Sequence, residues 1–199
     1  MAVTATHRAG VVQYFYQWAA VAEDGRPEAV AVSVDSAAAA VSAVVAVRAE
    51  AGDEMRAREF LSKVEHDRIV HAIRETESKT SGEIRVYVQR GKLNADPLIV
   101  AQRKFQRLHM HKTRNRNAVL IFVAPRAHKF AVVGDKAIHA KCGDEFWQRI
   151  IDGMRTHFQN EKFSHAIIEA IEEIGKVLAA HFPKRPTSAN ELPDDVVQG

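Results

Sequence analysis

Two apolar runs joined by a short loop form the most regular pattern in the sequence. The first run, residues 119–123, is unbroken, which is typical of a strand buried on both faces of a sheet. Residues 124–129 follow as a loop that contains Pro125, and residues 130–133 are apolar again. This spacing predicts an antiparallel hairpin around which the rest of the chain is arranged.

The pattern before the hairpin predicts a helix, a strand and a second helix. Ser62 and Glu65 have the spacing of a capping box, so the first helix is expected to begin there and to end before residues 81–82. Residues 83–89 alternate polar and apolar side chains and predict a strand with one buried face. Asp96, which precedes a proline, is the expected N-cap of the second helix.

Two further helices are predicted after the hairpin, with residues 143–144 and Ser164 as their caps. After residue 183 the chain becomes polar and proline-rich, which predicts a tail that does not pack. Apolar residues at helical spacing mark the buried faces of the last three helices. They are Leu98, Ala101, Phe105 and Leu108, then Trp147, Ile150, Ile151, Met154 and Phe158, and finally Ile167, Ile171, Ile174 and Leu178.

The order helix, strand, helix, strand, strand, helix, helix is typical of the α/β class. A strand joined to the next one through a helix usually lies parallel to it, and the hairpin then adds an antiparallel edge strand. We therefore predict a three-layer α/β/α sandwich around a small mixed sheet of about three or four strands. This domain is expected to span residues 55–183, and residues 184–199 are expected to form a flexible tail.

Residues 1–54 differ from the remainder in composition and charge. They contain three arginines and seven acidic residues, a net charge of −4, whereas residues 55–199 contain 25 basic and 18 acidic residues, a net charge of +7. Their start is a poor match to a signal peptide, and their alanine- and valine-rich stretch has no clear period. We expect a poorly ordered or loosely helical extension, and Met55 is a plausible natural start of the chain.

Cysteine usage and hydropathy favour a location in the cytoplasm or at the periphery of a membrane. The single cysteine, Cys142, excludes an intramolecular disulfide and fits a reducing compartment. No clear run of about 18 uncharged apolar residues predicts a spanning helix. Cys142 lies near an expected helix start, which stabilises a thiolate, but no base is paired with it in sequence and we expect it to be incidental.

Polar residues cluster at one predicted edge of the sheet. Glu83 begins the first strand, Asn117 precedes the second, and Asp135 ends the third. An antiparallel pair places the start of one strand beside the end of the next, so these residues are expected to meet, within reach of Asp144. They are candidates for binding a metal or acting on a phosphate, and the ordinary alternative is that each carboxylate only caps a helix, forms a turn or begins a strand.

Three segments resemble the TPM domain family, and its short bacterial members in particular. They are Ser-Gly-Glu-Ile-Arg-Val at residues 81–86, Asn-Ala-Val-Leu-Ile-Phe-Val-Ala-Pro at residues 117–125, and Val-Val-Gly-Asp at residues 132–135. The resemblance covers about residues 60–183 and implies an α/β/α module, often membrane-associated. Acid-phosphatase activity and divalent-metal binding have been proposed for some relatives.

Carried onto this chain, the resemblance implies Asp135 and Asp144 as catalytic residues and Asp135, Asp144 and Glu161 as metal ligands. Ca²⁺ and Mg²⁺ are the implied ions, since both prefer oxygen ligands, although no cofactor is expected to be required. Two positions depart from the family's Asp-Asn-Gly pattern, because Arg116 and Ala118 stand here on either side of Asn117. At Arg116 the change is one of charge. A cation therefore replaces a carboxylate.

A run of basic residues is the most visible surface feature, and no acidic residue interrupts it from Arg103 to Arg116. Its other members are Lys104, Arg107, His109, His111, Lys112 and Arg114, and Arg85, Arg90 and Lys92 are expected to extend it. Such a surface attracts phosphate, nucleic acid or an anionic membrane, although many charge runs are only solvated helix faces. The stacking aromatics of an RNA-binding module are missing from the sequence, so specific nucleic-acid binding is not expected.

His109 and His111 lie two residues apart in sequence. They are expected to point to different helix faces and not to share a metal.

Two function classes follow. The expected one is a non-catalytic TPM-like interaction module that docks on a membrane-associated protein or assembly through its basic helix, with Glu83, Arg85, Arg107, Arg114, Arg116 and Asn117 as binding residues. The alternative is a metal-assisted phosphatase acting through Asp135 and Asp144. The substituted carboxylate at Arg116 and the lack of an obvious nucleophile favour the first class, and the sequence leaves the substrate, the partner and the oligomeric state open.

Overall fold

The computed structural model describes residues 6–8, 11–17, 62–184 and 192–199 as a mixed sheet between two layers of helices. The sheet has six strands in the order β1-β2-β5-β4-β3-β6. The strands are β1 (Thr6–Arg8), β2 (Val11–Gln17), β3 (Ile84–Val88), β4 (Val119–Ala124), β5 (Lys129–Asp135) and β6 (Val196–Gln198). The helices are α2 (Lys63–Glu77), α3 (Pro97–Arg107), α4 (Lys136–Gln159) and α5 (Phe163–His181), with single 3-10 turns η1 (Met110–Lys112) and η2 (Pro125–Ala127).

The predicted hairpin forms the centre of the sheet. Strands β3 and β4 are parallel, β4 and β5 are antiparallel, and η2 occupies the loop between the last two. All six residues of β4 are buried, because helices cover both faces of the sheet. The same cover buries all five residues of β3, so the prediction that β3 has only one buried face is wrong.

The two faces of the sheet carry separate cores, which confirms the three-layer α/β/α prediction. Helices α2, α4 and α5 pack on one face against alternate residues of the strands, such as Val86 and Ile121. Helix α3 packs on the opposite face, where Phe105 meets Leu120 and the intervening strand residues. Trp147 of α4 is fully buried in the first core.

Strand β5 is not the edge of the sheet, which corrects the sequence prediction. Strand β2 pairs with it antiparallel along seven residues, from Val11 opposite Asp135 to Gln17 opposite Lys129. An unpaired edge strand exposes a row of peptide groups, and β2 satisfies those of β5. Residues 6–8 and 11–17 of the predicted extension therefore belong to the sheet, while the rest of residues 1–54 and the boundary at residue 54 lie outside the described residues.

The end of the predicted flexible tail also needs correction. Val196–Gln198 form β6, which runs parallel to β3, and Val196 is only 3% exposed. Two apolar residues at the chain end thus cover the other side of β3. Residues 185–191 of the same tail lie outside the described residues.

Two of the four predicted caps are present and two are not. Ser62 and Glu65 form both bonds of the capping box, and Asp96 accepts bonds from the first turn of α3. Ser164 lies inside α5, whose N-cap is Lys162. Helix α4 begins at Lys136, earlier than expected, with Asp135 as its N-cap, so residues 143–144 do not cap its start. The helix is interrupted at Gly143, whose φ of 67° lies in the left-handed region that favours glycine.

The buried faces of these helices follow the predicted spacing, although Leu98 and Leu108 at the two ends of α3 are only partly buried. None of the helices in the described part of the chain has the length and apolar character needed to cross a bilayer.

Candidate functional site

The rim of the sheet where β3 and β4 begin and β5 ends brings together the three predicted segments. The Val119 N–H donates to the Glu83 carbonyl at 2.8 Å, and the Asp135 N–H donates to the Ala118 carbonyl at 2.9 Å. The Asn115 side chain reaches the Ser81 hydroxyl at 3.0 Å across the same rim. The backbones of Glu83, Asn117 and Asp135 therefore lie at one edge, as the sequence predicts, but their side chains have different partners.

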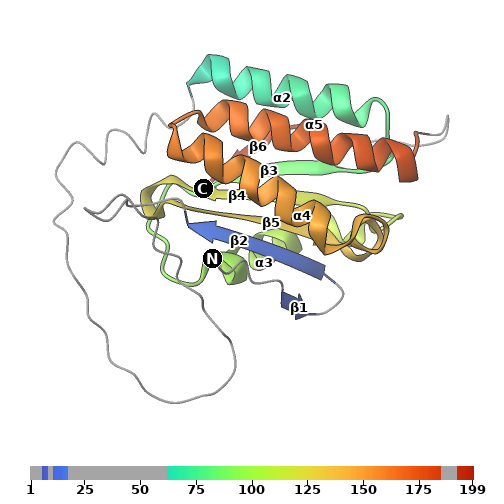
Figure 1. Cartoon of the computed structure of the whole chain (residues 1–199), viewed down its shortest axis with the longest axis horizontal. Helices are drawn as coiled ribbons and strands as arrows, with labels where there is room; N and C mark the ends of the chain where they lie inside the picture. The colour runs from blue at the N-terminus through green and yellow to red at the C-terminus, as the bar shows by residue number, and fades with distance from the viewer. Residues whose placement is uncertain (1–5, 9–10, 18–61, 185–191) are drawn as a thin grey trace, which may run out of the picture.

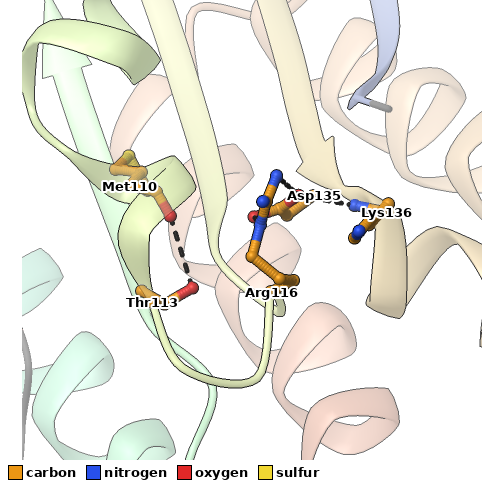
Figure 2. A network of polar contacts seen from close by, with 5 residues as sticks. All are labelled: Met110, Thr113, Arg116, Asp135 and Lys136. Atoms are coloured by element: carbon orange, nitrogen blue, oxygen red, sulfur yellow. Dashed lines mark hydrogen bonds and ion pairs between the residues drawn. The ribbon is translucent and has the colours of Figure 1, made fainter. Parts of the chain in front are cut away.

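Asp135 is fully buried and is held by Arg116 in a two-bonded ion pair (Figure 2). Arg116 Nε donates to Oδ2 at 2.8 Å, and Nη2 donates to Oδ1 at 2.9 Å. The Lys136 N–H donates to the same Oδ1 at 2.8 Å, so Asp135 also caps α4. The hydrogen bonds to Asp135 raise the pKa of Arg116 above its ordinary value.

The loop before β4 is shaped to deliver this guanidinium. The Thr113 hydroxyl donates to the Met110 carbonyl (Figure 2). The Thr113 carbonyl in turn accepts from the Arg116 N–H. Arg116 has a φ of 52°, a left-handed conformation that turns the chain, and its carbonyl accepts from the Ala137 N–H. The turn and the ion pair together fasten the loop to the start of α4.

Asn117 and Glu83 do not add to this ion pair. Asn117 is 1% exposed, and neither atom of its side-chain amide has a hydrogen-bond partner. Glu83 is buried as well, and its Oε2 accepts from the Leu192 N–H of the C-terminal segment at 3.2 Å. The predicted group of helpers around Asp135 is thus divided between two environments.

The remaining predicted metal ligands lie elsewhere. Asp144 follows the interruption in α4, with 63% of its side chain exposed and its Oδ1 3.8 Å from His139 Nε2. Glu161 is exposed in the turn between α4 and α5. Within the described segments, Asp135, Asp144 and Glu161 do not converge into a set of three ligands.

These residues do not fit a divalent cation at the rim. Ca²⁺ and Mg²⁺ need several oxygen ligands, commonly including carboxylates that carry the compensating charge. Both oxygens of Asp135 already accept hydrogen bonds, and the Arg116 guanidinium supplies the positive charge that an ion would bring. The side chain of Arg116 thus takes the electrostatic role of a bound cation.

A second polar group, missed in the sequence analysis, lies under the C-terminal segment. Glu77 is 7% exposed; its Oε1 accepts from the Ile84 N–H at 2.7 Å, and Asp194 is the neighbouring carboxyl group that acts most strongly on it. Burial, followed by the bond to Asp194, raises the pKa of Glu77 to about 9. Its position could have been found from the spacing, because Glu77 continues the buried helical series of Ile69 and Ile73.

Arg85 belongs to this second group and not to the basic surface. It is 5% exposed, and burial lowers its pKa even though the neighbouring carboxylates of Glu77 and Glu83 oppose that shift. The expectation that Arg85 extends the exposed basic run is therefore wrong. Its strand position explains the difference, because β6 and the segment before it cover β3.

Glu77→Gln is expected to make the protein more stable at pH 8 and to have little effect near pH 4. The pKa of Glu77 is about 9 in the folded chain against 4.5 as its ordinary value, so between these pH values the folded state holds a proton that the unfolded state has lost. Across this window Glu77 lowers the free energy of unfolding by up to about 1.4 kcal/mol per pH unit. Glutamine keeps the acceptor for Ile84 and a donor for Asp194.

The measurement is urea unfolding of both proteins from pH 4 to pH 9. Exposed Glu75, on the same helix, provides the matched control as Glu75→Gln. An equal gain at every pH, or none at pH 8, would contradict this assignment of the Glu77 proton.

The basic run lies on α3 and the loop that follows it. Arg103, Arg107, Lys112 and Arg114 are exposed there, and no acidic residue occurs between Asp96 and Asp135. Within the part of the chain that the structure describes, Arg103, Arg107 and Lys112 have no carboxylate within ion-pair distance. We call Arg103, Arg107, Lys112 and Arg114 the α3 basic surface.

A hollow of about 790 Å³ adjoins this surface. Lys92, Arg103, Lys104 and Arg107 contribute to its lining, together with apolar groups such as Leu93. Lys104 is less available than its neighbours, since its amine bonds the Tyr87 hydroxyl and lies 4.3 Å from the centre of that ring. The lining of the hollow therefore combines positive charge with apolar surface.

Cys142 and the histidine pair keep minor roles. Burial raises the pKa of the Cys142 thiol to about 11, so the thiolate is not available at neutral pH. His109 and His111 lie just beyond α3, around η1, with ring centres 6.3 Å apart. Burial lowers the pKa of His111 below its ordinary value.

Comparison with known proteins gives one family. The model of the TPM domain matches residues 55–177. The NMR structure of the BA42 protein from the psychrophilic bacterium Bizionia argentinensis is similar, with 35% sequence identity and a TM-score of 0.66 over 70% of this chain and 96% of that one. A search of curated proteins found no match. With more than half of its length matched by the family model and a fold shared with BA42, the chain belongs to the TPM domain family.

Proposed function

We propose that the chain is a non-catalytic TPM interaction module that docks on an acidic segment of a membrane-associated protein through the α3 basic surface. The observation that carries the proposal is the Arg116–Asp135 ion pair. It occupies the carboxylate that a phosphatase of this architecture would use and leaves the exposed cations of α3 as the main polar feature.

The described residues at the rim do not provide an accessible general base or a set of metal ligands. A general base or metal ligand must reach the substrate, whereas Asp135 is fully buried and both of its oxygens are bonded. Asp144 is exposed and pairs with His139, and within the described segments it belongs to no group of three potential metal ligands. The alternative, a metal-assisted phosphatase, has no such arrangement in its favour.

Docking through α3 is supported by charge and by shape. The exposed cations lie on one helix and its following loop, on the face of the sheet opposite α2, α4 and α5. The adjoining hollow offers apolar contact beside these charges, a combination suited to an extended acidic segment with apolar side chains. Anionic lipids would draw the same surface towards a membrane and increase the local concentration of the partner.

The triple variant Arg103→Ala, Arg107→Ala, Lys112→Ala is expected to lose membrane binding by about 100-fold, because each basic residue near an anionic surface contributes about 1 kcal/mol. The measurement is co-sedimentation of the full chain with native membranes, with protease-treated membranes and with protein-free anionic vesicles. The wild-type chain is expected to bind the native membranes best, and to bind more weakly as salt is raised. Arg68→Ala, Lys79→Ala, Lys176→Ala removes three exposed charges, from α2, from the turn after α2 and from α5, and is the control for an equal loss of positive charge.

Equal binding to native and protease-treated membranes would overturn the protein partner and leave only lipid attraction. Equal losses in the two triple variants would overturn the assignment to α3.

A separate assay with a generic phosphate monoester, with and without Mg²⁺ or Ca²⁺, is expected to show no turnover. Turnover that is lost in both Asp135→Asn and Asp144→Asn would overturn the non-catalytic role.

A further inference from the structure

Three potential metal ligands meet between the last two helices, on the face of the sheet away from α3. His157 lies in the last turn of α4, and His165 and Glu169 lie four residues apart on α5. Residues at this spacing occupy the same side of a helix. One ligand atom from each of the three residues lies within 4.8 Å of the other two.

The distances fit a small cation that binds nitrogen and oxygen. His157 Nε2 is 2.6 Å from Glu169 Oε2, and His165 Nε2 is 3.9 Å from the same oxygen. Ligands about 2.0 Å from a tetrahedral Zn²⁺ are about 3.3 Å apart, a value between the two. The centres of the two imidazole rings lie 4.6 Å apart, nearly perpendicular to each other.

The helices hold these side chains in place. Phe158, beside His157, and Ile167, between His165 and Glu169, are both buried in the core that joins α4 to α5. Ligands mounted on packed helices need little rearrangement when an ion binds. A simple ion pair needs only one imidazole for Glu169, so the second histidine is the feature that points to a metal.

We propose that His157, His165 and Glu169 bind one Zn²⁺ ion, which clamps the end of α4 to the start of α5. Two imidazoles and one carboxylate provide three of four tetrahedral positions, and water completes the set. The site is open to solvent, since His165 and Glu169 are exposed and His157 is partly so. It does not involve the rim carboxylates or the α3 basic surface.

The test is a competition titration of the metal-free full chain with Zn²⁺ and a chromophoric chelator. The wild-type chain is expected to bind one Zn²⁺ per molecule and to show an increase in melting temperature. His165→Ala and Glu169→Gln are each expected to lower the affinity at least tenfold and to abolish that increase. His181→Ala removes an exposed histidine from the other end of α5 and is expected to behave as the wild type.

Co²⁺ provides a readout of geometry, because a tetrahedral ion absorbs visible light much more strongly than a six-coordinate one. The wild-type chain is expected to give the intense tetrahedral spectrum, and His165→Ala is expected to lose it. Both substituted side chains are exposed, so circular dichroism will show these variants folded. Failure to bind Zn²⁺ stoichiometrically, a six-coordinate Co²⁺ spectrum, or unchanged affinity in His165→Ala and Glu169→Gln would overturn the site.

Discussion

Arg116→Ala is expected to lower the free energy of unfolding by about 3 kcal/mol, because it leaves a buried carboxylate without its counter-charge. Asp135 is fully buried, and among the described residues the donor that remains once the guanidinium is removed is the Lys136 N–H. A third of the Arg116 side chain is exposed, so water partly solvates the pair and the cost falls at the low end for buried ion pairs. Urea unfolding monitored by fluorescence measures the change.

A double-mutant cycle separates the ion pair from other effects of the substitutions. Asp135→Asn and Arg116→Ala are expected to be less than additive when combined, with a coupling of about 1–3 kcal/mol. The exposed pair of Glu75 and Lys79 is the control, and Glu75→Ala is expected to cost less than about 1 kcal/mol. If the two cycle variants add without coupling, the bond between these side chains does not stabilise the fold.

The same position allows a direct test of the cation's role. Arg116→Asp places a second carboxylate beside Asp135 and is expected to destabilise the chain more than Arg116→Ala does. Ca²⁺ or Mg²⁺ is expected to recover part of the loss, because an ion would then supply the charge that Arg116 provides in the wild type. No recovery at millimolar ion would show that the rim cannot hold a cation even with two carboxylates.

Trp147→Ala is expected to cost about 3–5 kcal/mol, the range for removing a large aromatic side chain from a core. Trp147 is fully buried where α4 crosses the sheet, and its ring lies directly over Gly134 of β5.

A Cβ atom at Gly134 would lie 2.6 Å from the Trp147 Cζ2 atom, closer than real contacts allow. Gly134→Ala is therefore expected to cost about 1–3 kcal/mol through overpacking.

The contact predicts a specific rescue. Trp147→Phe removes the ring atoms that a Cβ at Gly134 would meet, so Gly134→Ala is expected to cost less in that background than in the wild type. Gly153→Ala, at a helical glycine of α4 with nothing within 4 Å of the added atom, is expected to be neutral or slightly stabilising. Denaturant unfolding of the four variants measures both effects, and an undiminished cost of Gly134→Ala beside Trp147→Phe would disprove the contact.

The sequence by itself determined the order of the elements from α2 to α5 and much of what each one buries. The unbroken run in β4, the capping box at Ser62 and the spacing of Ile167, Ile171, Ile174 and Leu178 are all confirmed. These patterns are readable because a helix and a strand impose fixed periods on neighbouring residues. The meeting of three strand ends at one rim also follows, since it depends only on strand direction.

These patterns do not predict which strands lie next to each other at the edges of the sheet. Strand β2 pairs with β5 across more than a hundred residues, and β6 joins β3 from the other end of the chain. Periodicity marks which face of a segment is apolar, but it does not identify the strand that completes the hydrogen bonds of an edge.

The partners of the polar side chains were decided only by the tertiary structure. The sequence shows that Arg116 is a cation in place of a carboxylate, yet its bonds to Asp135 depend on the left-handed turn and on the start of α4. Burial of Arg85 beside Glu77 and the meeting of His157 with His165 likewise require segments to pack. Hydrogen bonds and ion pairs form over about 3–4 Å between whichever groups folding brings together, and no local period encodes that choice.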